Sequence, residues 1–383
     1  MRAGRGRGLG KWLAWVAVFA ILITGAVAAG ANATDANAAD APFRLDAPPK
    51  VAMVLFSQRS DGGWTNAFDA ARKQMEKDLG QTIDYYNNVD ADRAHIFAAT
   101  ERLIAKGNNI IIGTGYDYSE PFTYLADKHP NVAFLNGGGF TNGRNLQSFY
   151  GRTFDSQYLC GMVAGAMSKT GRLGFVAAFD FPTVVQSFNG FTLGARQMNP
   201  KATVDVRFTK TWADPNVEQD VALRVIDGGA DVIGQNVDTP RPVVVAQARG
   251  ILATGHHRDL TRYAPRATIC SSVWYWERYL TPTVRAIAAG TWKPDPNGAV
   301  PDFKDGPSDI VINRALVPDD IYMRVMQERQ AIINGKNIFT GPIRNDKGAE
   351  VVANGKALSI ADISTITWHV QGVATPEQHP QQP

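Results

Sequence analysis

Cysteine and catalytic motifs are both scarce in this sequence of 383 residues. Its two cysteines, Cys160 and Cys270, are too few for a disulfide scaffold, and their spacing does not show whether they pair. The first expected strand is not followed by Gly-x-Gly-x-x-Gly, and there is no phosphate-binding loop, Gly-x-Ser-x-Gly elbow or His-Glu-x-x-His motif. His256 and His257 are adjacent but have no evident third ligand. We therefore expect no catalytic residue, no metal and no cofactor.

A strong excess of one charge is also missing. The formal net charge is +3, but the first 33 residues hold four basic residues and no acid, which leaves −1 for the remainder. A chain near neutrality has no electrostatic footprint for nucleic acid or for an anionic membrane. We therefore expect its partners to be a small molecule or a protein.

The amino terminus has the order of an export signal. Basic residues from Arg2 to Lys11 precede an apolar run from Trp12 to about Ala29, and the small-residue segment AAGANATDANAADA follows. This order predicts a cleaved signal peptide and linker over residues 1–39, although about eighteen apolar residues are also enough for a permanent anchor. No cysteine stands directly after the run, so we expect a periplasmic protein without a lipid anchor.

Short apolar segments alternate with amphipathic segments along the rest of the chain. KVAMVLF at 50–56 has the composition of a buried strand, and Trp64, Phe68, Ala71 and Met75 share one face of the following helix. The alternation predicts an α/β fold with doubly wound parallel sheets in two lobes. We expect one lobe over 50–153 plus about 273–312, the other over 154–272 plus about 313–345, and a C-terminal extension over 346–383.

Aromatic rings and isolated polar groups gather at the expected carboxyl ends of the strands, where such folds bind ligands. Among them are Trp64, Tyr116, Phe181, Trp212, Trp274 and Trp276, together with the polar Asp61, Gln186, Asn189, Asn236 and Asp238. Flat apolar faces with a few hydrogen-bonding groups suit a planar heteroaromatic ligand, although sugars are bound by similar residues.

Each of these residues also has a structural interpretation. A single tryptophan is more often part of a core than of a ligand platform. Asp61, Asp214 and Asp238 precede expected helices, where capping is an equally good explanation. Their convergence on one edge of the sheets is what favours a binding role.

Several motifs, in this order, resemble the basic membrane protein (Bmp) family of solute-binding proteins. They are KVAMVLFSQRSDGGWTNAFDAAR, GTGYDY, GFVAAFDFPTVVQSFNGFTLGA, TWADP and FTGPI, and the resemblance covers residues 50 to 345. It implies a type I periplasmic binding-protein fold, whose two lobes are joined by a multi-strand hinge and close on the ligand. It also implies a monomer that serves the membrane permease of an ABC importer and that has no catalytic activity.

Nucleoside receptors of this family have Asp-x-x-Phe-Asn after the first strand, which here corresponds to Asp61, Trp64 and Thr65. The resemblance implies that the rings of Trp64 and Tyr116 sandwich the ligand. At the positions where it implies ribose-binding groups, however, this chain has TGHHRD and SSVWYW, so the expected aspartate and lysine are replaced. A site that has lost these groups is expected to bind nucleosides poorly.

The motifs GWT, PxVVQxxN, TWxDP and QxxD are instead similar to those of a purine-base subgroup, which implies a ligand such as adenine. We expect stacking by Trp64, Tyr116 and Phe181 or Trp276, and edge recognition by Gln186, Asn236 and Asp238. Two alternatives remain, namely an extracytoplasmic sensor of the same ligands and a periplasmic nucleoside hydrolase. The hydrolase is disfavoured because the loop after the first strand has a single aspartate, Asp61.

Overall fold

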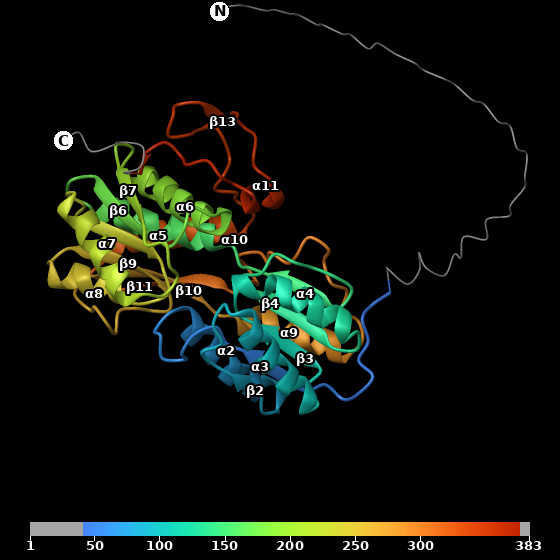
Figure 1. Ribbon diagram of the computed structural model, residues 1–383. Coiled ribbons are helices and arrows are strands. Elements are labelled where there is room, and N and C mark those ends of the chain that lie inside the picture. Colours follow the sequence, from blue (N-terminus) through green and yellow to red (C-terminus); the bar gives the residue numbers. More distant parts are fainter. Residues whose placement is uncertain (1–40, 376–383) are drawn as a thin grey trace, which may run out of the picture. The chain divides into compact units, whose positions relative to one another are not determined.

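The computed structural model describes residues 41–375. The signal peptide and linker predicted for residues 1–39 lie outside the described residues, as does the end of the C-terminal extension from residue 376. Figure 1 shows that the described chain is built from sheets flanked by helices. Two of these sheets are large and almost entirely parallel, which confirms the predicted α/β fold class.

The first sheet has the strand order β2-β1-β3-β4-β5 and is parallel throughout. Its strands are β1 (Val51–Val54), β2 (Asp84–Tyr86), β3 (Ile110–Gly113), β4 (Ala133–Gly137) and β5 (Leu146–Phe149). The connecting helices are α2 (Trp64–Leu79), α3 (Arg93–Ala105), the short η1 (Tyr116–Tyr118) and α4 (Ser119–Lys128). In β1, Val51 and Met53 enter one core while Ala52 and Val54 enter another, because successive side chains point to opposite faces.

The second sheet has the order β11-β10-β9-β8-β6-β7-β14. Its strands are β6 (Arg172–Ala177), β7 (Thr203–Phe208), β8 (Val232–Asn236), β9 (Leu252–His257), β10 (Thr268–Trp274), β11 (Ser308–Ile312) and β14 (Val373–Ala374). Its helices are α5 (Thr153–Met167), α6 (Pro182–Met198), α7 (Pro215–Asp227), α8 (Arg241–Ala248) and α10 (Asp319–Ile333). Strand β11 is antiparallel to β10, and the other pairs are parallel.

After β10 the chain leaves the second sheet, and it re-enters this sheet at β11. Helix α9 (Glu277–Ala288) returns to the core of the first sheet, where Leu280 and Val284 pack with Phe68. Strand β11 then pairs with β10, so residues 308–312 lie in the second sheet and not with the first lobe as expected. The apolar pattern of this segment predicts a strand, but it does not identify the neighbour.

The C-terminal extension is attached to the second sheet. It contains β13 (Glu350–Val352), which pairs with the preceding β12 (Ile343–Arg344), α11 (Ile360–Ser364) and β14, which adds to the edge strand β7. The side chain of Asn189 on α6 bonds both to the Trp368 carbonyl at 2.8 Å and to the Val370 amide at 2.9 Å. These contacts fix the extension against the helix that carries several of the predicted site residues.

Helices α5 and α6 lie in unusually close contact, which depends on glycine. A Cβ atom on Gly161 of α5 would lie 2.0 Å from the Phe191 carbonyl oxygen, and one on Gly194 of α6 would lie 1.9 Å from the Tyr158 carbonyl oxygen. Any larger residue at these positions would push the two helices apart. The close contact fixes the position of α6, whose first turn borders the cavity described below.

Candidate ligand-binding site

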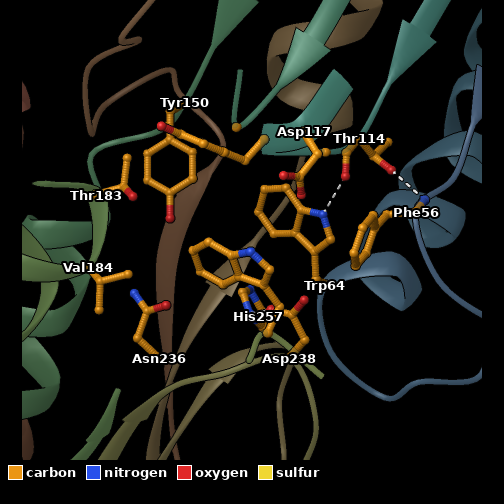
Figure 2. Close-up of a pocket in the computed structure, with 14 residues that line it drawn as sticks. Phe56, Trp64, Thr114, Asp117, Tyr150, Thr183, Val184, Asn236, Asp238 and His257 are labelled. Atoms are coloured by element: carbon orange, nitrogen blue, oxygen red, sulfur yellow. Dashed lines mark hydrogen bonds and ion pairs between the residues drawn. The ribbon is translucent and has the colours of Figure 1, made fainter. Parts of the chain in front are cut away.

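A cavity of about 50 Å³ lies where the carboxyl ends of strands from both sheets meet (Figure 2). The segments around the first sheet contribute Phe56, Trp64, Thr114, Tyr116, Asp117 and Tyr150. The segments around the second sheet contribute Thr183, Val184, Trp212, Asn236, Asp238 and His257. This is the edge that the sequence predicts for ligand binding.

The indole of Trp64 is held rigidly in the cavity wall. Its Nε1–H donates to the Thr114 carbonyl oxygen at 2.8 Å, as Figure 2 shows, and its ring packs edge-on against Phe68 and Trp276 with centroids 5.0 and 5.5 Å away. Only 8% of the residue is exposed. A ring fixed in this way presents a flat apolar face to the cavity at little entropic cost on binding.

The position of Trp64 is determined by the start of α2. The Asp61 carboxylate accepts backbone N–H bonds from Gly63, Thr65 and Asn66, all at 2.9 Å, which satisfies donors that the helix leaves free. Burial raises the pKa of Asp61 to about 6, against the opposing effect of these hydrogen bonds. Gly63 lies so close to Asp238 that a Cβ atom there would be 1.9 Å from the Asp238 carbonyl oxygen.

A second group of aromatic rings lies at the rim of the cavity. Tyr116 and Phe181 stack with centroids 5.9 Å apart and an interplanar angle of 23°, and both remain more than a third exposed. Phe181 also stacks on Phe179 at 5.0 Å, and Trp212 packs edge-on against Phe179 at 4.9 Å. Tyr116 lies in η1, after strand β3 of the first sheet, and Phe181 lies directly before α6, after strand β6 of the second sheet, so this contact joins the two sides of the cavity.

A chain of hydrogen bonds ends at Asp238 in the cavity wall. Trp274 Nε1–H donates to His257 Nδ1 at 3.0 Å, and His257 Nε2 lies 3.1 Å from Asp238 Oδ1. Because Nδ1 accepts a hydrogen bond, the proton of this histidine is on Nε2, which donates to the carboxyl group. The chain from Trp274 through His257 therefore fixes the orientation of Asp238.

Burial also determines the charge of this pair. It raises the pKa of Asp238 to about 8 and lowers the pKa of His257 to about 3, because each charged form loses its hydration. At neutral pH both groups are therefore uncharged. A neutral carboxyl group whose Oδ1 accepts from His257 keeps an O–H on Oδ2 that can donate to a ligand.

Two further polar groups face the cavity. Asn236 Nδ2 donates to Ser187 Oγ at 2.8 Å, which leaves its carbonyl oxygen to accept from a ligand. Figure 2 shows the Tyr150 hydroxyl pointing into the space between the two sides of the site. The cavity thus combines aromatic faces with a short edge of hydrogen-bonding groups.

The comparison with known proteins agrees with this architecture. A family model described as ABC transporter substrate-binding protein PnrA-like (Bmp) matches residues 49–346. A purine-binding protein of Brucella abortus is 31% identical over 330 residues, which are 85% of this chain and 92% of that protein. The chain belongs to the Bmp family of ABC-transporter substrate-binding proteins. Such proteins bind small molecules outside the cytoplasm and deliver them to a membrane permease.

Other relatives of this Bmp-family protein extend the comparison. A Haloferax volcanii protein named as a putative glucose-binding protein of an ABC transporter is 31% identical over 246 residues. These residues are 64% of this chain and 62% of that protein. A solute-binding protein from Conexibacter woesei has a TM-score of 0.61 and 22% identity over 75% of this chain and 97% of its own. A transcriptional activator of the comK gene from Bacillus halodurans has a TM-score of 0.66 and 21% identity, and the match covers 74% of this chain and 98% of that one. The likeness to these structures agrees with a two-lobe type I periplasmic binding-protein fold for this chain.

Membrane-spanning helices and metal clusters are both absent from the described residues. Between residues 41 and 375, no helix combines the length and the apolar character that are needed to cross a bilayer. No group of three or more His, Cys, Asp or Glu side chains in this part of the Bmp-family chain is placed to hold a metal ion.

Part of the ligand set predicted from the sequence meets in the cavity. Its wall includes Trp64, Tyr116, Trp212, Asn236 and Asp238. Phe181 contacts Tyr116 at the rim without lining the cavity. These six residues remain our predicted ligand contacts.

The other predicted ligand contacts of this Bmp-family chain do not line the cavity, and four of them have structural partners. Asp61 caps α2, and Thr65 Oγ1 accepts the Ser57 N–H at 3.1 Å. Asn189 holds the C-terminal extension. Trp276 is completely buried between the rings of Phe68 and Trp274, at 4.7 and 4.4 Å, in the core of the first sheet. Gln186 is buried on α6 outside the cavity wall.

The sequence patterns do not single out His257 and Tyr150. The adjacent pair His256–His257 suggests at most a metal site, whereas His257 acts as a neutral hydrogen-bond donor to Asp238. Tyr150 follows β5, a strand of four residues. No helix connects β5 to β4, so the strand–helix alternation that reveals the other strands is missing here. Both residues lie at a strand end, and that position is the signal that could have identified them.

Proposed function

We propose that this Bmp-family protein is the periplasmic binding component of an ABC importer and that its ligand is a purine base. One observation supports this most strongly: the fixed indole face of Trp64 lies in the same cavity as the hydrogen-bonding edge of Asp238 and Asn236. A planar heterocycle needs both features, a face for stacking and an edge for recognition. The purine-binding name of the Brucella relative agrees with this ligand class.

The replaced ribose-binding segments favour a free base over a nucleoside. TGHHRD supplies His257, and SSVWYW supplies Trp274. Trp274 donates to His257, and His257 is in turn hydrogen-bonded to Asp238, so neither side chain is available to hold ribose hydroxyl groups. A nucleoside would bring hydroxyl groups into a wall without matching partners there, which lowers its affinity.

The neutral state of Asp238 suggests how the edge of a base is recognised. A protonated carboxyl group donates from Oδ2 to an unprotonated ring nitrogen, and the Asn236 carbonyl oxygen accepts from an amino group. Adenine offers both partners, whereas the ring N–H groups of guanine would prefer an ionised carboxylate. We therefore propose that adenine binds more tightly than guanine.

Ligand binding in this proposal closes two lobes without a chemical step. Contacts from both sides of the cavity, such as those of Trp64 and Asn236, stabilise the closed form, which then docks on a permease. A sensor would use the same closure to contact a signalling receptor. Incubation with adenosine tests the hydrolase alternative, because release of free adenine and ribose would contradict a purely binding role.

Isothermal titration calorimetry with adenine, guanine, hypoxanthine, adenosine and glucose tests the ligand class. We expect adenine to bind most tightly, and glucose is included because of the name of the Haloferax relative. Substitution Trp64→Leu removes the stacking face, and Asn236→Ala removes the acceptor at the opposite wall. Trp64→Leu should weaken adenine binding about 10-fold or more, since base stacking contributes roughly 1–3 kcal/mol. Asn236→Ala should weaken it about 2–10-fold, since a hydrogen bond contributes roughly 0.5–1.5 kcal/mol.

The melting temperature of each variant without ligand checks that it is folded, and Tyr124→Ala is a matched control. Tyr124 is a half-exposed aromatic residue on α4 that does not line the cavity. Unchanged adenine affinity in a folded Trp64→Leu variant would disprove the stacking role. Much tighter binding of adenosine or glucose than of adenine would disprove the proposed ligand class.

A further inference from the structure

We propose that Cys160 and Cys270 form an intramolecular disulfide bond in the exported protein. They are the two cysteines of the entire chain, and both are free thiols in the structure. Although they are 110 residues apart in sequence, their Sγ atoms lie 2.9 Å from each other. The two sulfur atoms are thus already in contact, and only a small movement separates them from bonding distance.

The contact is a consequence of how α5 packs on β10. One turn before Cys160, Ser156 Oγ lies 2.8 Å from Ser272 Oγ, which is two residues after Cys270. Residues four apart share a face of a helix, and residues two apart share a face of a strand. The two pairs therefore form consecutive contacts along one interface, and the register of the two elements holds the thiols together.

The compartment provides the chemistry. Bmp-family proteins act outside the cytoplasm, where disulfide bonds form and persist. In exchange with a disulfide of a thiol oxidoreductase or of glutathione, the two thiols lose two protons and two electrons as one protein S–S bond forms. The oxidant's S–S bond breaks, and its two sulfur atoms take up the protons and electrons as thiols.

The timing of the reaction follows from burial. Both cysteines are completely buried, and burial raises the pKa of the Cys160 thiol well above its usual value. Because the thiolate is the reacting form, the folded dithiol protein should react very slowly with an external disulfide. The bond therefore forms during folding after export, before α5 closes over β10.

The bond would reinforce the second sheet. The loop that it closes contains β6, β7, β8 and β9, and β10 continues from Cys270 to Trp274, the donor to His257. Closing a loop of this length restricts the unfolded chain strongly. We expect the oxidised protein to melt about 5–10 °C higher than the reduced protein.

The test compares two preparations of the wild-type full chain. One is exported to the periplasm of a bacterial host through its own signal, and the other is produced without the signal in a reducing cytoplasm. Each is unfolded in denaturant with a thiol-alkylating reagent and weighed by intact-mass spectrometry. We expect no alkyl group on the exported protein until a reductant is added, and two on the cytoplasmic protein.

Two free thiols in the exported protein, or a disulfide-linked dimer on a non-reducing gel, would overturn the proposal. Wild-type protein that is reduced in denaturant and then refolded provides the reduced form for a melting-temperature measurement. The oxidised and reduced forms are thus compared without a cysteine variant. In Cys160→Ser/Cys270→Ser the reductant should have no effect on the melting temperature. In the matched control Ser156→Ala/Ser272→Ala, which alters the same interface, the full effect of the reductant should remain.

Discussion

At the scale of single residues, Asp238 connects ligand recognition with the pH dependence of stability. Its pKa is about 8 in the folded protein and about 4 in an unfolded chain. At pH values between about 4 and 8, Asp238 therefore retains a proton in the folded state that it has lost in the unfolded state. The stability contributed by this group is complete below about pH 4 and is lost as the pH rises towards 8.

The variant Asp238→Asn should make the stability of the ligand-free protein less dependent on pH. Between pH 6.5 and 8, the free energy of unfolding should fall less steeply than in the wild type, by at most about 1.4 kcal/mol per pH unit. Urea unfolding at several pH values measures this slope. Asp61 and Glu218, whose pKa values burial raises to about 6 and 8, leave some pH dependence in the variant. An identical slope in both proteins would show that Asp238 is ionised when folded.

At the scale of elements, the start of α2 links the two sides of the site. Gly63 has a negative φ, so its need for glycine comes from lack of space, since a Cβ atom there would lie 1.9 Å from the Asp238 carbonyl oxygen. Substitution Gly63→Ala should displace Trp64 from Asp238. We expect it to weaken adenine binding about 10-fold or more and to lower stability by about 1–3 kcal/mol.

The control for this substitution lies at the other end of the same helix. Gly80 has φ of 66°, and a Cβ there would have no neighbour within 4 Å. Gly80→Ala should lower stability by about 1 kcal/mol through backbone strain alone and leave adenine affinity unchanged. Calorimetry and urea unfolding of both variants separate the two effects. Equal loss of affinity in both would show that the contact at Gly63 has no special role.

The elements themselves are largely predictable from periodicity. Trp64, Phe68 and Ala71 recur on one face of α2, and that spacing depends on local geometry alone. Strand β5 escapes prediction because it is short and lacks a crossover helix, and the expected sheet for β11 is wrong because strand composition does not specify a partner. Local patterns reveal which elements form, whereas pairing depends on residues far away in sequence.

The candidate site is less predictable for the same reason. Trp64, Asn236 and Asp238 can be identified because strand ends converge in this fold class. The position of Asn189, however, depends on a C-terminal segment about 180 residues away that occupies its amide. The role of His257 likewise depends on Trp274 from another strand.

At the scale of the whole molecule, the rim contact between Tyr116 and Phe181 joins the two sides of the cavity. If the lobes open to release ligand, as we propose, this stacking is lost on opening. Aromatic pairs contribute about 0.5–1.5 kcal/mol, so Phe181→Ala should speed ligand dissociation about 2–10-fold. Association should change little, because an open form has no such contact to break.

Phe140 provides the control, since it packs on the same Tyr116 ring at 4.8 Å but belongs to the first-sheet side. Phe140→Ala alters the surroundings of Tyr116 without removing a contact between the two sides, so it should leave dissociation nearly unchanged. Stopped-flow fluorescence of the cavity tryptophans measures both rates. Faster dissociation in Phe181→Ala alone shows that Phe181 holds the closed form, through its contact with Tyr116 or with the ligand, whereas equal effects of both substitutions would show that it only positions Tyr116.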